Sequence, residues 1–239
     1  AASACKYTIL LLSAPLGSGH KMAAEALEEA IKKHGNVKVV NGSAFDFFRV
    51  LGNIILGGYI GILKHIPKLY DIAYHWSNTG NNSFWLRDFF KLLLSYLAQG
   101  FIKKTSPDAV IVSTLRGGGY GAVQKRCAPG LWLGAVITDF NFHHWWIYKG
   151  LDVYFTADES IQPPPELGIP AVVTGIPVRS ASARLLSAKV AQQAGYAADD
   201  TLCLVMGGGD GLLPMPELLR ALTECRDIKG LKIAACNGA

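Results

Sequence analysis

The sequence lacks closely paired cysteines and is poor in charged residues. Its five cysteines lie far apart and no two have the C-x-x-C spacing, so the sequence indicates neither a zinc site nor a disulfide framework. Reduced thiols are the simpler interpretation. Only 17% of the residues are charged and 50% are hydrophobic, a composition that excludes an intrinsically disordered chain.

Long apolar runs are also missing. In the segment 47–70, the longest uncharged run is Val50–Leu63, 14 residues, which is shorter than the roughly 20 residues that span a bilayer. This pattern favours a segment that lies in the lipid interface with its basic residues at the headgroups. An ordinary pair of buried helices explains it equally well. The candidate contacts are Arg49, Ile54, Ile55, Tyr59, Lys64 and Lys68.

The excess of basic residues is mild. The chain of 239 residues carries 23 Lys and Arg against 18 Asp and Glu, a net charge of +5. Such a charge suits an anionic partner, such as phosphate groups, a nucleotide or an acidic membrane surface. It does not select one of them.

Strand-like and helical segments alternate along most of the chain. A helical pattern fills the interval between the first two strands, and further helices are expected near 84–104 and 118–127. This order predicts an α/β fold, a Rossmann-like parallel sheet with helices on both faces. Short apolar runs predict strands at 6–13, 36–41, 108–114, 131–139, 151–157 and 171–175.

The pattern then starts again. An apolar strand at 201–206, a glycine loop, a helix and a strand at 230–236 repeat the opening of the chain. We therefore expect two domains, 1–180 and 181–239, the second made of a linker helix and a first βαβ unit. Because domains of this kind run to roughly 100–150 residues, the second domain is expected to be incomplete here.

A glycine turn followed by a histidine joins the first strand to the first helix. In "SAPLGSGHKM", Gly17 and Gly19 precede His20. Backbone N–H groups at such a turn bind anions, although a tight turn explains the glycines as well. A helix N-terminus disfavours the imidazolium, so His20 is expected to stay neutral and to accept a proton as a general base does. The alternative is a histidine that caps or packs the turn.

A second cluster, "TDFNFHHWW" over 138–146, closes the strand at 131–139. Thr138 and Asp139 end that strand, where open α/β sheets bind their ligands. At most one of the two adjacent histidines, such as His143, is expected to face that cleft. The tryptophans Trp145 and Trp146 favour a binding surface. The alternative is a loop anchored by tryptophan, with an exposed aspartate.

A third glycine-rich stretch, "MGGGDG" over 206–211, lies between a strand and a helix. Consecutive glycines there allow close approach of a diphosphate. A flexible junction is the alternative. The candidate donor contacts are Gly207, Gly208, Gly209 and Gly211.

With these features, the chain resembles the family of monogalactosyldiacylglycerol synthases and processive diacylglycerol glucosyltransferases. That family belongs to the two-domain glycosyltransferases that include the lipid-linked N-acetylglucosaminyltransferase of peptidoglycan synthesis. The matching stretches occur in the family's order and cover almost the whole chain. They are "GSGHKMAAEAL", "TDFNFHHWW", "DVYFTADE", "VTGIPVR" and "VMGGGDG".

The resemblance implies a fold of the GT-B type, in which two Rossmann-like domains face a cleft. It implies transfer of a hexose from UDP-hexose to diacylglycerol or a similar lipid, with inversion and without a required cofactor or metal. His20 would be the base, Asp139 and His143 would complete the catalytic motif, and no nucleic acid would bind.

The resemblance also implies a location. The segment 47–70, together with Trp145 and Trp146, would contact the acceptor and an anionic membrane, so the protein would lie peripherally on the cytoplasmic side. The family's contacts to the nucleotide base would follow the last residue, so a partner chain could supply them. The alternatives are a non-catalytic lipid-binding fragment and a sugar-nucleotide epimerase, which has no use for the apolar segment.

Overall fold

We analysed a computed structural model of the chain, which divides into two compact units, Ala1–Ser180 and Ala181–Ala239. The units are described separately. The structure describes residues 7–13, 18–43, 57–58, 61–62, 65–66, 68–69, 72, 75, 99, 102–113, 128–147, 149–180, 192–193, 195–197, 200–208, 213–224 and 231–236.

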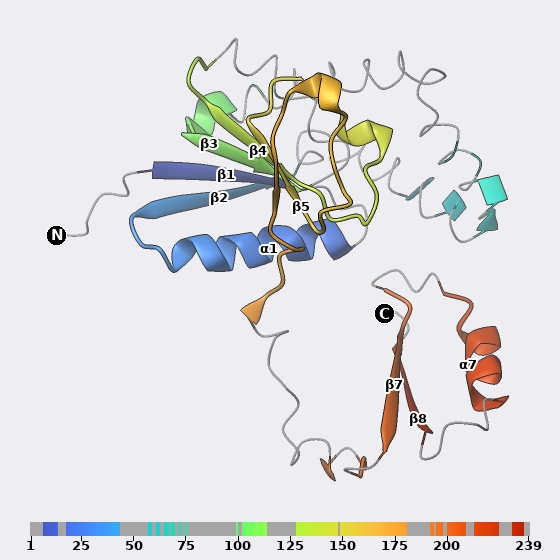
Figure 1. Cartoon of the computed structure of the whole chain (residues 1–239). Coiled ribbons are helices and arrows are strands. Elements are labelled where there is room, and N and C mark those ends of the chain that lie inside the picture. The colour runs from blue at the N-terminus through green and yellow to red at the C-terminus, as the bar shows by residue number, and fades with distance from the viewer. Residues whose placement is uncertain are drawn as a thin grey trace. The chain divides into compact units, whose positions relative to one another are not determined.

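A parallel sheet of six strands forms the first unit (Figure 1). The strands lie in the order β2-β1-β3-β4-β5-β6. Because β1 lies between β2 and β3, the chain changes its direction across the sheet at the β1/β3 boundary, and open α/β sheets bind ligands at the carboxyl edge beside such a point. The strands are β1 (Tyr7–Ser13), β2 (Val37–Ser43), β3 (Ala109–Val112), β4 (Trp132–Val136), β5 (Val153–Thr156) and β6 (Ala171–Val173).

Alternate residues of the inner strands form the main core on one face of this sheet. Leu10 pairs in register with Val110, and Val110 with Leu133, so one row of apolar side chains crosses three strands. Burial of each such side chain stabilises the fold by about 1.5–3 kcal/mol. The members of this core with 0–1% exposure are Leu10, Leu12, Val110, Val112, Leu133, Ala135, Ile137, Trp146 and Tyr154.

Helix α1 (Ser18–Lys32) packs against β1 and β2 (Figure 1). Its buried residues are the small Ala23, Ala24 and Ala26. Leu11 is 2% exposed and points away from the face of Leu10, because side chains alternate along a strand. α1 and the main core therefore occupy opposite faces of the sheet.

Two aspartates fix the amino edge of the sheet. The N–H of Thr8 donates to Oδ2 of Asp108 at 2.7 Å, and the N–H of Leu133 donates to Oδ2 of Asp152 at 2.8 Å. Each aspartate precedes a strand and binds the N–H of a residue at the start of the neighbouring strand. These carboxylates therefore serve strand pairing, at the edge opposite to the expected ligand site.

The last residues of the first unit are tied to α1. Arg179 Nη1 lies 3.5 Å from Glu25 Oε2, and the N–H of Ser180 donates to Glu29 Oε2 at 3.1 Å. Lys33 Nζ donates to Ser180 Oγ at 2.8 Å. The hydrogen bonds from Ser180 and the Lys33 ammonium lower the pKa of Glu29 to about 2.

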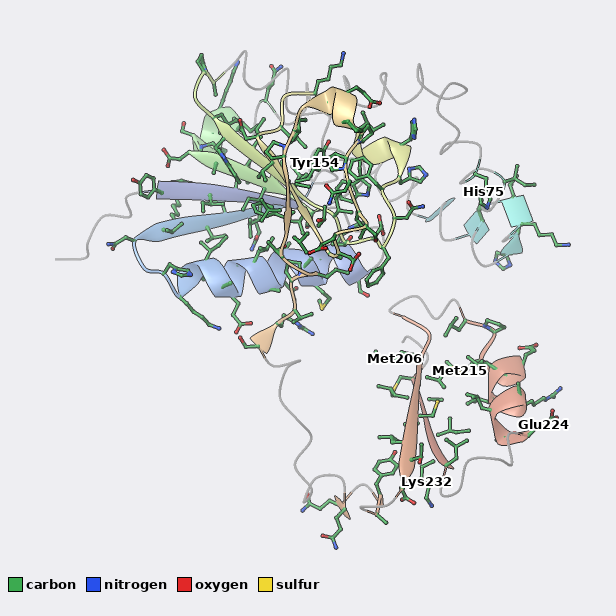
Figure 2. The ribbon with its side chains drawn as sticks, in the orientation of Figure 1. His75, Tyr154, Met206, Met215, Glu224 and Lys232 are labelled. Atoms are coloured by element: carbon green, nitrogen blue, oxygen red, sulfur yellow. The ribbon has the colours of Figure 1, made fainter. Side chains whose placement is uncertain are left out.

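The second unit contains the parallel pair β7 (Thr201–Met206) and β8 (Leu231–Cys236) with helix α7 (Met215–Glu224). Val205 and Met215 are buried, whereas the side chains on the other face of β7 are exposed (Figure 2 labels Met206 and Met215). The exposed fractions are 47% for Leu202, 57% for Leu204 and 61% for Met206.

The predicted α/β fold with a parallel sheet is confirmed, and each predicted strand is present. Most strands are slightly shorter than predicted, whereas β2 extends two residues further and β7 has the predicted bounds. The predicted helices at 84–104 and 118–127 lie largely outside the described residues, as does the linker helix. Ile102, in the short helical stretch 102–105, packs into the main core, so helical structure lies on both faces of the sheet.

Candidate functional site

The carboxyl ends of β1, β3 and β4 bring polar side chains together from distant parts of the sequence. His20 follows β1 in the first turn of α1, Ser113 follows β3, and Thr138 and Asp139 follow β4. The Ser113 N–H donates to the Leu12 carbonyl at 3.0 Å and so continues the β1–β3 ladder. The site therefore lies at the β1/β3 boundary and reaches β4.

His20 is held by contacts to its side chain and to its backbone. Thr138 Oγ1 lies 3.1 Å from His20 Nδ1, and the Ser113 hydroxyl donates to the His20 carbonyl at 3.1 Å. Ser113 is 1% exposed. Two strand ends thus fix the histidine at the start of α1.

The environment of His20 favours the neutral imidazole. Burial lowers the pKa of His20 from its ordinary value of 6.5, and the charge of Asp139 and a hydrogen bond with the Ser113 backbone oppose this shift without cancelling it. The unprotonated ring can accept a proton near neutral pH. The nearby carboxylate stabilises the imidazolium that such a transfer produces.

Asp139 is oriented by a tryptophan. Trp146 Nε1 donates to Asp139 Oδ2 at 3.1 Å, and Tyr154 Oη donates to the Trp146 carbonyl at 2.7 Å. Trp146 and Tyr154 are both 0% exposed. The expectation that Trp146 contacts lipid is therefore wrong in this structure, because the indole covers the sheet and its N–H binds the aspartate.

The rest of the loop after β4 divides into buried and exposed parts. His143 is 3% exposed, so its imidazole is shielded from solvent. The His143 carbonyl accepts a hydrogen bond from the backbone N–H of Trp146 at 2.8 Å. The catalytic role of His143 stays a prediction. The backbone of Trp145 lies in a short 3-10 helix, His144–Trp146, and its side chain lies outside the description. Phe140 is 80% exposed beside Asp139.

The glycine turn before α1 is described in part. Gly17 lies outside the described residues, and Gly19 is exposed in the first turn of α1. A Cβ added at Gly19 would meet no heavy atom within 4 Å among the described residues. Packing among the described residues therefore does not require a glycine there, and these residues leave room for a ligand beside it.

The second glycine loop follows β7. Gly207 N–H donates to the Cys236 carbonyl at 2.8 Å, and Gly208 has a φ of 73°, which side chains rarely adopt. Gly209 and Gly211 lie outside the described residues, so the predicted diphosphate contact stays a prediction.

The apolar segment is described only at separate positions. Arg49, Ile54, Ile55, Tyr59 and Lys64 lie outside the described residues, and Lys68 is exposed. At helical spacing around it, Ile62, Ile66, Leu69 and Ile72 are 39–66% exposed. No helix among the described residues is long and apolar enough to cross a membrane.

One residue of the site was missed by sequence reasoning. Ser113 follows β3, and the only signal it carries is that position at the carboxyl edge. Thr138 was recognised with Asp139 as the end of a strand, but its contact with His20 was not predicted. In the part of the chain that the structure describes, no group of three or more His, Cys, Asp or Glu side chains could hold a metal ion.

A parallel α/β sheet, with a histidine and an oriented carboxylate at its switch point, defines the first unit as a Rossmann-like domain. The family model of monogalactosyldiacylglycerol (MGDG) synthase matches residues 20–178, about two thirds of the chain. The chain belongs to this family.

Curated relatives agree with this assignment, and a solved structure shares the fold. Processive diacylglycerol beta-glucosyltransferases of Bacillus cereus (strain AH187) and Bacillus mycoides (strain KBAB4) are each 24% identical over 241 residues, which covers 97% of this chain. The chain spans 61% of the length of these relatives. The spinosyn rhamnosyltransferase SpnG shares the fold with a TM-score of 0.50 and 13% identity, over 95% of this chain and 65% of that one.

Proposed function

We propose that the protein transfers a hexose from a UDP-sugar to diacylglycerol, as part of glycolipid synthesis. The observation that carries this proposal is the position of His20 at the carboxyl edge of the sheet, where Thr138 contacts its Nδ1, burial lowers its pKa and the charge of Asp139 acts on it. Membership of the family and the printed names of the diacylglycerol glucosyltransferases support the lipid acceptor. The donor and the stereochemistry are our inference.

The proposed reaction is a single displacement. The acceptor hydroxyl oxygen attacks the anomeric carbon while His20 takes its proton, and the bond from that carbon to the UDP oxygen breaks with inversion. Asp139 stabilises the imidazolium, and UDP leaves as an anion whose charge backbone N–H groups can bind. This chemistry needs no redox cofactor.

The two units would bind different substrates. The first unit would take the acceptor, because it carries His20, and the open space at Gly19 lets a substrate approach the start of α1. The second unit would begin the donor domain, with the loop after β7 near the diphosphate.

The exposed apolar positions of the second unit support a longer assembly. Leu202, Leu204 and Met206 leave one face of β7 open to water, and such a face is normally covered in an α/β domain. Further polypeptide would cover it, either more of the same chain or a partner chain that completes the donor domain.

The exposed stripe Ile62, Ile66, Leu69 and Ile72 supports contact with a membrane surface. Together with exposed Lys68 and the net charge of +5, it suits an anionic leaflet. The protein would then bind peripherally on the cytoplasmic side, where the diacylglycerol acceptor is reached from the interface.

The test is hexose transfer by the longest natural form of the protein, with labelled UDP-glucose or UDP-galactose and vesicles that contain diacylglycerol. His20→Ala should lower turnover by about 10²–10⁴-fold, since general-base catalysis contributes that much. His34→Ala, at an exposed histidine in the turn after α1, is the matched control and should keep wild-type turnover.

The same assay tests the alternative, a lipid-binding module without catalysis. Vesicle binding without glycolipid product from either donor would support the module. Product formation that His20→Ala leaves unchanged would keep the transferase and remove His20 from the role of base.

A further inference from the structure

The contact between Thr138 and the ring of His20 joins two segments that are 118 positions apart. Thr138 Oγ1 lies 3.1 Å from His20 Nδ1, and the contact is partly buried. Thr138 stands just before Asp139 at the end of β4, so the position of its hydroxyl is set by the sheet. This geometry gives Nδ1 a partner that belongs to the sheet.

This partner matters because a neutral imidazole has two tautomers. One ring nitrogen then carries the proton and the other carries the lone pair. A base can accept the acceptor's proton through Nε2 only if the resident proton is on Nδ1. The partner of Nδ1 therefore decides whether Nε2 presents a lone pair or a hydrogen atom to the acceptor.

Ser113 and Thr138 hold different groups of the histidine. The Ser113 hydroxyl donates to the backbone carbonyl of His20, so Ser113 lies against the main chain at the start of α1. Thr138 Oγ1 lies against Nδ1 of the ring, and a hydroxyl oxygen can accept a hydrogen bond from an Nδ1–H. A proton on Nδ1 therefore has an acceptor within the protein.

We propose that Thr138 is a positioning residue whose hydroxyl holds the His20 proton on Nδ1 and so makes Nε2 the atom that deprotonates the acceptor. This inference rests on the proposed function only for the role of His20 as a base. The tautomer itself is a property of the protein without substrate, so it can be tested separately.

The first test is nitrogen NMR of the protein with ¹⁵N-labelled histidine, near pH 8. The chain has six histidines, and His20→Asn identifies the signals of His20 by their loss. The wild type is expected to show a protonated Nδ1 and an unprotonated Nε2. Thr138→Val, which keeps the shape and removes the hydroxyl, should shift His20 toward the Nε2–H form, and Thr138→Ser should restore the wild-type signals.

Two spectra would overturn the proposal. One is a wild-type spectrum in which His20 carries its proton on Nε2. The other is a Thr138→Val spectrum identical to that of the wild type. If Thr138→Val does not fold, Thr138→Ala provides the same comparison with less bulk in the loop.

The second test is kinetic and uses the transfer assay above. Thr138→Val should lower kcat about 10-fold or more with little change in KM, because a wrong tautomer removes the base without removing the binding site. Thr138→Ser should recover most of the rate. Equal rates for the valine and serine variants would contradict the role of the hydroxyl.

The two proposals fail in different ways. If His20→Ala keeps its turnover, the proposed function loses its base while the NMR result still decides the tautomer. If His20→Ala is inactive but Thr138→Val leaves the spectrum unchanged, only the role of Thr138 is wrong.

Discussion

Trp146 Nε1 donates a hydrogen bond to Asp139 Oδ2 at 3.1 Å, from a side chain with no exposed surface. The carboxylate is therefore oriented by a buried part of the sheet unit. Its charge acts on His20, whose pKa it raises against the larger effect of burial. Trp146, a residue of the core, thus affects the pKa of His20 through the carboxylate of Asp139.

We expect Trp146→Phe to affect both stability and turnover. The substitution leaves an aromatic ring but removes the N–H, and hydrogen bonds to charged groups contribute about 1.5–3 kcal/mol. Turnover should fall because Asp139 loses its fixed orientation. Tyr154→Phe is the control, since it removes the hydroxyl that binds the Trp146 carbonyl and does not touch Asp139. A larger loss of turnover in Tyr154→Phe would contradict this assignment.

The pH dependence of kcat/KM should report His20 and its neighbour. The pKa of His20 lies below 6.5, so activity is expected to persist below pH 6.5 and to fall only as the ring becomes protonated. Asp139→Asn removes a charge that favours the imidazolium, so it should move the acid limb to still lower pH while reducing the rate. An acid limb that moves to higher pH in Asp139→Asn would contradict the electrostatic role.

Gly19→Ala should separate stability from function. The position lies in the first turn of α1 with no heavy atom within 4 Å of an added Cβ among the described residues, so alanine should keep or raise stability, by up to about 1 kcal/mol. If a substrate approaches the backbone there, transfer should fall. Thermal unfolding and the transfer assay on the same sample measure both effects, and unchanged transfer would place the substrate elsewhere.

The contact of Glu29 with Ser180 should affect the free energy of unfolding at acidic pH. The folded pKa of Glu29 is about 2, against an ordinary value of 4.5. Its contribution to stability is therefore complete above pH 4.5 and is lost as the pH falls from 4.5 toward 2. Glu29→Gln should lower the free energy of unfolding at pH 7 and flatten its dependence on pH in that window. Identical acid unfolding of variant and wild type would show that the contact does not stabilise the fold.

The exposed apolar stripe should bind anionic vesicles. We expect Ile66→Asn with Leu69→Asn to weaken cosedimentation with phosphatidylglycerol vesicles about 10-fold, because apolar burial contributes about 25 cal/mol per Å². Val178→Asn, at a side chain that is 68% exposed in the segment after β6, is the matched control. Binding of wild type and the double variant to the same extent would remove the stripe from the membrane surface.

Much of the sheet could be predicted from the sequence, because buried parallel strands are short, continuous apolar runs such as those that became β1 and β5. His20 was found because a glycine turn and an amphipathic helix mark it locally. Ser113 was not, and the contact of Thr138 with His20 was not, since both contacts come from the register of β1, β3 and β4. Trp146 was misassigned because the density of tryptophans does not show which face of the loop covers the sheet.

Helix α1 connects the contact with Ser180 to the candidate site. Glu29 holds Ser180, the last residue of the first unit, and His20 lies nine residues earlier on the same helix, about 13 Å along its axis. A tilt of about 4° around Glu29 would move His20 by about 1 Å, a displacement that can change a rate by about 10². Strain applied to the chain where it leaves the first unit would therefore displace His20, the proposed base, without any change of residue in the site.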